Sequence, residues 1–300
     1  MFISQPKCQT FKSTLHRQPY SDQAKAIIDK INAIEEIAFI SMSYQKTCRI
    51  NVVTTREGLD KLMTLLKLLS VSINTAIPKL SIDAFLSSQY RVPVFSFYLP
   101  IFNYDELSLA AFDKALDLLN TPNQDDCFVS QDLLDKSRAM PAKHPLAQDG
   151  PYASECQRIR QALSQRKGIH CFIAKVENDS TAVLANQLIL RSVCTAEGFK
   201  DLVDFFVNVE AILEDRAFVT AVFHAAQGVS SSSIHITPLV VLQKDNTKYD
   251  FHHVDDSIFR FGEAVVPEKN EPVMTELISE RLNECVNKVV AAAEEGYKVD

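Results

Sequence analysis

Hydrophobic and polar positions recur along this chain with two periods, one helical and one strand-like, and their order predicts the fold. In the first half, apolar residues at helical spacing alternate with short runs rich in β-branched and aromatic residues. The expected elements there are a helix at 21–35, strands at 37–44 and 48–53, a long helix from Thr55, a helix at 81–88, a strand at 90–99 and a helix at 105–119.

The second half predicts nearly the same order of elements. We expect a helix at 154–166, strands at 169–176 and 182–193, a long helix at 195–213, a helix at 216–226, strands at 234–242 and 249–254, and a closing helix at 272–293. Each half therefore reads as an α-β-β-α-α-β-α module with the helices on one face of an antiparallel sheet. The predicted fold class is α+β.

A short sequence repeat indicates that the two modules arose by tandem duplication. Residues 50–69 and 190–209 keep nearly all their apolar positions in register. Five pairs are identical at one constant offset: Val53/Val193, Thr55/Thr195, Glu57/Glu197, Gly58/Gly198 and Leu62/Leu202. Because the chain contains only 7 glycines, the matched pair of glycines carries extra weight.

Composition changes mark the domain boundaries. Residues 121–152 are dense in Pro, Asp and Asn, which is typical of a linker. The predicted organisation is a flexible N-terminal arm at 1–20, a first α+β module at 21–120, the linker at 121–152 and a second α+β module at 153–300.

Charge and cysteine content restrict the function classes. The net charge of −7 argues against a broad nucleic-acid footprint, which needs a basic face. No apolar run reaches the roughly 20 residues of a membrane span, so we expect no membrane association. The 7 cysteines are scattered and form no Cys-x-x-Cys pair, which favours free thiols in a reducing, cytoplasmic compartment. No nucleotide or other cofactor motif occurs, so no cofactor is expected.

The repeated corner of Thr55, Glu57 and Gly58 has two interpretations. A glycine in the first turn of a helix lets a ligand approach the backbone N–H groups, as in phosphate sites. However, a single glycine beside a carboxylate is a poor phosphate site. A helix cap with close strand packing explains the same residues, and we favour this structural interpretation.

One catalytic constellation can be drawn from the second half. If residues 244–248 form a hairpin turn, Asp255 lies diagonal to His235 on one face, as a general base and its orienting carboxylate require. Cys156 sits in the first turn of a helix, where the dipole lowers a thiol pKa. Cys156, His235 and Asp255 also follow the chain order of papain-like hydrolases, although no local pattern of those enzymes surrounds Cys156. These residues predict a cysteine-nucleophile hydrolase or transferase as the alternative function.

A second polar group lies in the predicted strand at 249–254 and just beyond it. His252, His253 and Asp256 are candidate ligand-binding residues. Adjacent strand residues point to opposite faces, so the two histidines could not chelate a metal together, and no metal site is predicted.

The leading functional hypothesis is a non-catalytic binding protein of two modules. It would recognise a protein partner or a small ligand at the cleft between the modules, because pockets often form between domains. The acidic, alanine-rich tail at 291–295 and the lack of motifs suggest a secreted bacterial effector as a further possibility, which would act in the host cytosol.

Overall fold

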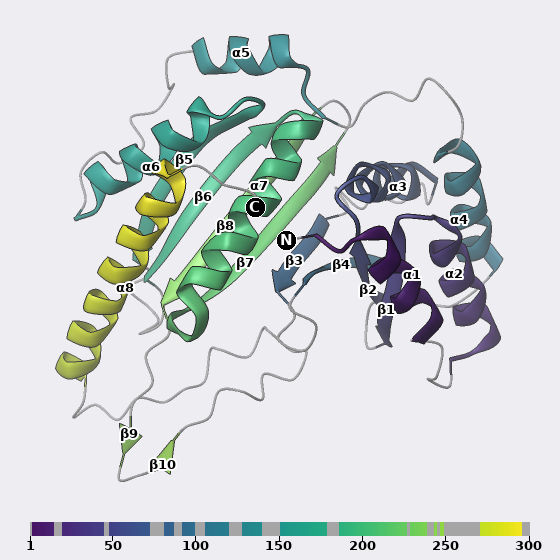
Figure 1. Cartoon of the computed structure of the whole chain (residues 1–300), viewed down its shortest axis with the longest axis horizontal. Helices are drawn as coiled ribbons and strands as arrows, with labels where there is room; N and C mark the ends of the chain where they lie inside the picture. The colour runs from purple at the N-terminus through teal and green to yellow at the C-terminus, as the bar shows by residue number, and fades with distance from the viewer. Residues whose placement is uncertain are drawn as a thin grey trace.

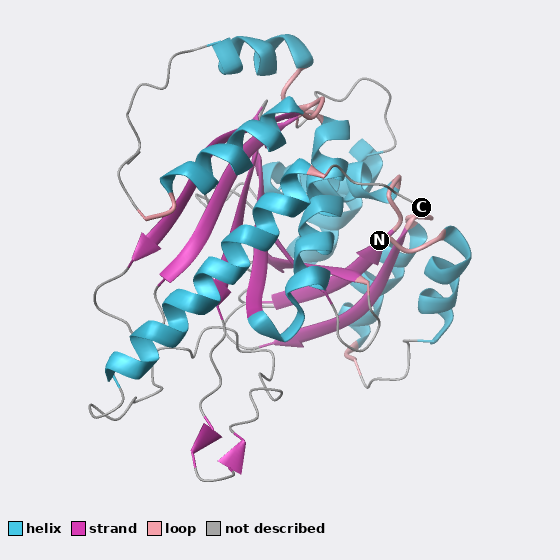
Figure 2. Ribbon diagram, turned by 60° about the vertical axis from the view of Figure 1, so that its left-hand side comes forward, coloured by secondary structure: helices cyan, strands magenta, loops and turns pink. Residues whose placement is uncertain are grey.

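The computed structural model describes residues 2–14, 20–44, 48–72, 81–86, 92–99, 106–119, 128–139, 151–178, 186–226, 229–238, 243–244, 247–248 and 271–295. Within these ranges the chain has an α+β fold (Figures 1 and 2). Its helices are α1 (Gln5–Thr14), α2 (Asp22–Ala33), α3 (Gly58–Ser72), α4 (Glu106–Leu119), α5 (Gln131–Ala139), α6 (Ala153–Gln165), α7 (Ala196–Leu213) and α8 (Glu271–Glu294). Its strands are β1 (Ile37–Tyr44), β2 (Cys48–Thr54), β3 (Ser81–Leu86), β4 (Pro93–Leu99), β5 (Ile169–Asn178), β6 (Asn186–Cys194), β7 (Ala217–Ala226), β8 (Val229–Pro238), β9 (Gln243–Lys244) and β10 (Thr247–Lys248).

Eight strands form one continuous antiparallel sheet in the order β1-β2-β4-β3-β7-β8-β6-β5. The two halves of the chain meet where β3 pairs with β7, so β1 and β5 lie at the outer edges. Counted from its outer edge, each half has the order first, second, fourth and third strand. Both edge strands contain a bulge, between Phe39 and Ser41 in β1 and between Cys171 and Ile173 in β5. β9 and β10 form a separate two-stranded ladder.

Two predicted helices are wrong, because residues 81–88 and 216–226 contribute the central strands β3 and β7. In β7, Ala217, Val219 and Ala221 are buried, whereas the residues between them are only half-buried. This period of two is that of a strand. Both segments are short and contain alanine, which local propensity reads as helix, but pairing along both edges of each strand decides the outcome. The module is therefore α-β-β-α-β-β-α in place of the predicted α-β-β-α-α-β-α.

One hydrophobic core joins the six longer helices to alternate residues of the strands. Figure 1 shows α6, α7 and α8 lying across the strands of the second half. Phe199, Phe205 and Phe206 of α7 are fully buried, and Phe199 packs edge-on against Phe223 of β7 with ring centroids 4.7 Å apart. Because successive strand residues point to opposite faces, this shared core places the six helices on one side of the sheet. No helix in the described ranges has both the length and the apolar character that a membrane span requires.

A short helix precedes the first long helix of each half. Residues Gln5–Thr14, expected to be a flexible arm, form α1, and Cys8 and Phe11 pack against Ala38 and Val53 on the opposite side of the sheet. α5 lies within the expected linker and buries Leu134. Both segments are therefore parts of the folded structure.

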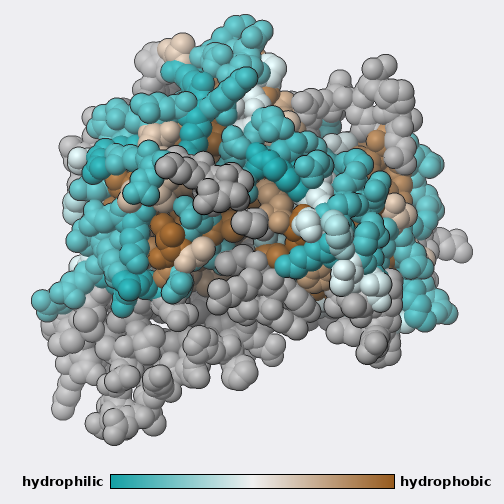
Figure 3. Space-filling view, in the orientation of Figure 1, coloured by the Kyte–Doolittle hydropathy of each residue, from teal (hydrophilic) through white to brown (hydrophobic). Residues whose placement is uncertain are grey.

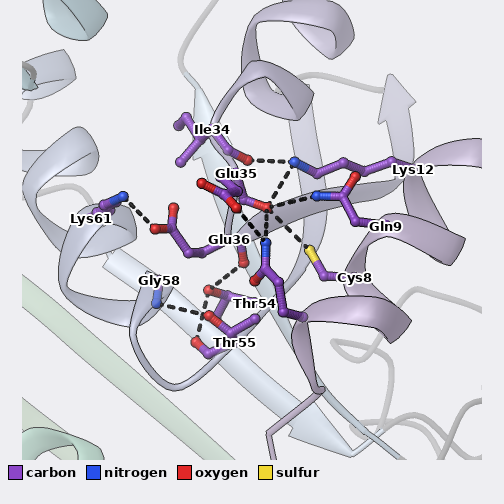
Figure 4. Close-up of polar contacts among 11 residues, drawn as sticks. Cys8, Gln9, Lys12, Ile34, Glu35, Glu36, Thr54, Thr55, Gly58 and Lys61 are labelled. Carbon is purple, nitrogen blue, oxygen red and sulfur yellow. Dashed lines mark hydrogen bonds and ion pairs between the residues drawn. The ribbon is translucent and has the colours of Figure 1, made fainter.

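The α1 helix is held by polar contacts to the end of α2 (Figure 4). Lys12 Nζ donates to the carbonyl oxygens of Asn32 (2.8 Å), Ile34 (2.6 Å) and Glu35 (3.0 Å). A cation at these carbonyls complements the negative end of the helix dipole. Burial among them lowers the pKa of Lys12 below its ordinary value. On α5, Arg138 donates to the carbonyl of Arg166 (2.8 Å), just past the end of α6.

The Thr–Gly corners are helix caps. Thr55 Oγ1 accepts a hydrogen bond from the N–H of Gly58 at 3.1 Å, and Thr195 Oγ1 accepts one from Gly198 at 3.2 Å. The N–H of Thr195 donates to the carbonyl of Gly168 at 2.9 Å. A Cβ atom on Gly198 would lie 1.9 Å from that same carbonyl oxygen, so only glycine fits. Both corners are thus explained by capping and close packing.

Ion pairs reinforce the junction between the halves. Arg56, just before α3, pairs with Asp201 (2.6 Å) and with Asp204 of α7. Lys200 Nζ lies 2.7 Å from Asp60 Oδ2, and Lys200 is buried. Together with the β3–β7 ladder, these contacts occupy the boundary where the sequence predicted a cleft between modules.

Candidate functional site

The side of the second-half sheet that faces away from α6, α7 and α8 carries polar side chains, interspersed with Ile173, Ile189, Val193, Phe218 and Val222. Along β8, Ser232, Ile234 and Ile236 are buried towards the helices, and the residues between them are half-buried on the opposite side. Their neighbours on β5, β6 and β7 project in the same direction. We call the following residues the polar face: Lys175, Glu177, Gln187, Arg191, Thr220, Ser231, Ser233, His235 and Thr237.

His235 is the centre of a hydrogen-bond chain on the polar face. Its Nε2 lies 2.7 Å from Ser233 Oγ, and its Nδ1 lies 3.2 Å from Gln187 Oε1. With the Gln187 amide oxygen as acceptor, the network assigns the proton to Nδ1, and Nε2 accepts from the Ser233 hydroxyl. The neutral imidazole therefore satisfies both of its neighbours.

Burial lowers the pKa of His235 below its ordinary value, and the positive charge of Arg191 lowers it further. The carboxylate of Glu177 acts in the opposite direction. His235 is consequently neutral at pH 7. The Ser233–His235–Gln187 hydrogen-bond chain resembles the nucleophile and base of a catalytic triad. Its third member, Gln187, is an uncharged amide, which stabilises an imidazolium much less than a carboxylate does.

Arg191 supplies the exposed charge of the polar face. It stands opposite Ser233 in the β6–β8 register, and its side chain is exposed, whereas Ile189 two residues earlier is buried. Lys175 is paired with Glu177 on the edge strand β5. Among the described residues, no carboxylate lies within ion-pair distance of Arg191.

The structure does not bring Cys156 and His235 together. Cys156 is on α6, is 7% exposed and belongs to the core beneath the helices. His235 projects from the opposite face of the sheet. Burial raises the pKa of the Cys156 thiol to about 11, and nearby Glu155 adds to the effect. This thiol is protonated at pH 7 and is a poor nucleophile.

The predicted partner Asp255 lies outside the described residues, as do His252, His253 and Asp256. β9 and β10 pair across the predicted turn, Gln243 with Lys248 and Lys244 with Thr247. The strand of His235 is paired on its two sides with β6 and β7, so His235 faces Ile189 and Thr220. Both ladder positions beside His235 are therefore filled.

The described part of the chain shows a shallow hollow and no cluster of metal-ligating side chains. Within this part, no group of three or more His, Cys, Asp or Glu side chains converges. A shallow hollow of about 320 Å³ lies between α6 and α8, bordered by Arg158, Arg166 and Glu294. Arg158 and Glu294 form a two-pronged ion pair across it, at 2.8 and 2.6 Å. This side of the molecule is largely hydrophilic in Figure 3.

Comparison of the chain with protein-family models, with curated proteins and with solved structures gave no match. The candidate site therefore rests on geometry alone.

Sequence reasoning identified His235 but missed the residues that surround it. Ser233, two positions away on the same strand face, was recoverable from strand alternation. Gln187 and Arg191 come from β6, and their position beside His235 depends on the β6–β8 pairing, which no local pattern announces.

Proposed function

We propose that this chain is a non-catalytic binding protein that recognises a protein partner through the polar face. The observation that carries the proposal is an exposed guanidinium, without an ion-pair partner among the described residues, beside a hydroxyl–imidazole–amide chain on the sheet face opposite the six core helices. A sheet surface of this kind is broad, whereas small ligands are usually held in concave sites. The predicted location between modules is replaced by this face.

We also propose that the two halves are a tandem duplication of the corrected α-β-β-α-β-β-α module, each copy preceded by a short helix. Equivalent contacts support it. The N–H of Phe39 donates to Asn32 Oδ1 at 2.9 Å, and the N–H of Cys171 donates to Ser164 Oγ at 3.0 Å, each linking the first strand to the preceding helix. The edge-strand bulges directly follow Phe39 and Cys171. Coincidence of such details is unexpected for unrelated modules.

Under this duplication, the polar face is where the copies have diverged. Asn51 corresponds to Arg191, and Ser96 to Ser233. In the first half Asn51 is 6% exposed, and its amide nitrogen donates to Ser41 Oγ (2.7 Å). The hydroxyl of Ser96 donates to the amide oxygen of Asn51. That row is buried and internally bonded. The second half has the exposed Arg191 in place of this amide.

Affinity capture with matched variants tests the proposal. Ser233→Arg places a bulky charge on the polar face, and Gln161→Arg places the same group on exposed α6 as the control. Both proteins are first compared with wild type by circular dichroism and thermal unfolding. We expect a set of captured proteins retained by Gln161→Arg and lost by Ser233→Arg. Retention of every captured protein by folded Ser233→Arg would refute the assignment of the face.

A further inference from the structure

We infer that the partner presents a carboxylate group, on an acidic segment of polypeptide, to Arg191 and Ser233. This inference rests on the proposed function and specifies the chemistry of the partner. A planar guanidinium offers paired N–H donors that match the two oxygens of a carboxylate. The Ser233 hydroxyl, directly opposite on β8, adds a third donor at the same place.

The charge distribution favours an anionic partner despite the net charge of −7. On the polar face, Lys175 and Glu177 compensate each other, so Arg191 leaves one positive charge uncompensated by described residues. Ile173 lies opposite Arg191 on the edge strand and is half-buried. An acidic residue flanked by apolar ones would fit both side chains.

Binding of the carboxylate is coupled to the protonation of His235. In the free protein the Ser233 hydroxyl donates to Nε2 of His235. When that hydroxyl turns to the carboxylate, Nε2 loses its donor, and a proton taken up there can donate to Ser233 Oγ. The resulting chain runs from Gln187 through His235 and Ser233 to the ligand with every group satisfied. The charged or titratable groups facing His235 are Arg191 on β6 and Lys175 and Glu177 on β5, while β7 contributes Thr220. Acidic peptides should therefore bind more tightly at pH 6 than at pH 8.

An array of immobilised 12-residue peptides in matched pairs, differing only in Glu against Gln, tests the inference with the full-length chain. Inorganic phosphate is the competitor. We expect Glu members to retain at least about tenfold more protein, which corresponds to about 1.4 kcal/mol. Arg191→Gln should abolish the preference, and Arg158→Gln, an arginine on the helix side, should preserve it. His235→Gln should keep the preference but lose its increase towards pH 6.

Equal binding of paired peptides, binding of none, or a preference that survives in folded Arg191→Gln overturns the inference. Displacement of the Glu peptides by phosphate at millimolar concentration also overturns it, because the site would then select any small anion. Failure here is separable from failure of the function: if Ser233→Arg still loses captured proteins, the face binds a partner of different chemistry.

Discussion

The Gly198→Ala variant gives a sharp test of how α7 is fixed to β5. Two effects of opposite sign compete at this position. Helix propensity favours alanine over glycine by about 1 kcal/mol in a helix interior. Against this, the new methyl carbon would lie 1.9 Å from the Gly168 oxygen and 2.3 Å from its carbonyl carbon, and both are backbone atoms that no rotamer change can move.

The steric term should win. Relieving the overlap moves the start of β5 away from α7 and breaks the 2.9 Å hydrogen bond from Thr195 to Gly168, worth about 1 kcal/mol. Overpacking of this kind costs about 1–3 kcal/mol more. After subtraction of the propensity gain, we expect a net loss of about 1–3 kcal/mol in the free energy of unfolding.

Urea unfolding followed by circular dichroism measures this loss. Gly58→Ala is the matched comparison, since its new methyl would meet backbone less closely: Thr54 Oγ1 lies at 2.3 Å, Glu36 Cβ at 2.6 Å and the Glu36 carbonyl oxygen at 2.9 Å. We expect a smaller loss there. If Gly198→Ala is as stable as wild type, or more so, the close approach of the two backbones does not constrain this corner.

Three further outcomes follow from the structure. Lys200→Asp should cost about 1.5–3 kcal/mol in unfolding free energy, because Asp60 then faces a like charge. The double variant Lys200→Asp with Asp60→Lys should recover part of this loss. Additive losses in the double variant would contradict the pairing of Lys200 with Asp60. In native protein at pH 7.5, peptide mapping after iodoacetamide treatment should find Cys156 unmodified until urea unfolds the chain, since its thiol is buried with a pKa of about 11; rapid native labelling would argue for a reactive cysteine. Burial lowers the folded-state pKa values of His170 and His235, so the unfolded chain takes up protons first and stability falls as pH drops below about 6.5. The urea midpoint of His235→Gln should therefore fall less than that of wild type between pH 7.5 and 5. An identical fall would show that His235 does not contribute to the loss of stability at low pH.

Local patterns were sufficient for the helices and hairpins that carry their own periodicity. The closing helix, the long helix from Thr195 and the hairpin of β5 and β6 all lie close to their predicted positions. These elements pair with or follow their sequence neighbours, so short windows contain the relevant information. The predicted class, α+β, is that of the structure.

The predictions that failed concern elements whose structure depends on contacts between residues far apart in the sequence. β7 is a strand because β3, more than 130 positions earlier, pairs with it, for instance through Ala84 and Ala221. The same limit applied to the site. Counting along a local hairpin offered only Asp255, which lies outside the described residues, and could not find Gln187, 48 positions from His235 on β6. Composition and charge do not encode such pairings.

The bulges in β1 and β5 matter for how copies of this chain behave towards one another. Pairing of β3 with β7 consumes both inner edges within one chain, so the described sheet ends at two strands on opposite sides of the molecule. A flat edge at each end would let copies add one after another without closing, which generates a fibre. The irregularities after Phe39 and Cys171 bend each outer strand and interrupt its ladder. The chain thus carries protection against open-ended polymerisation at each of the two places where it could begin.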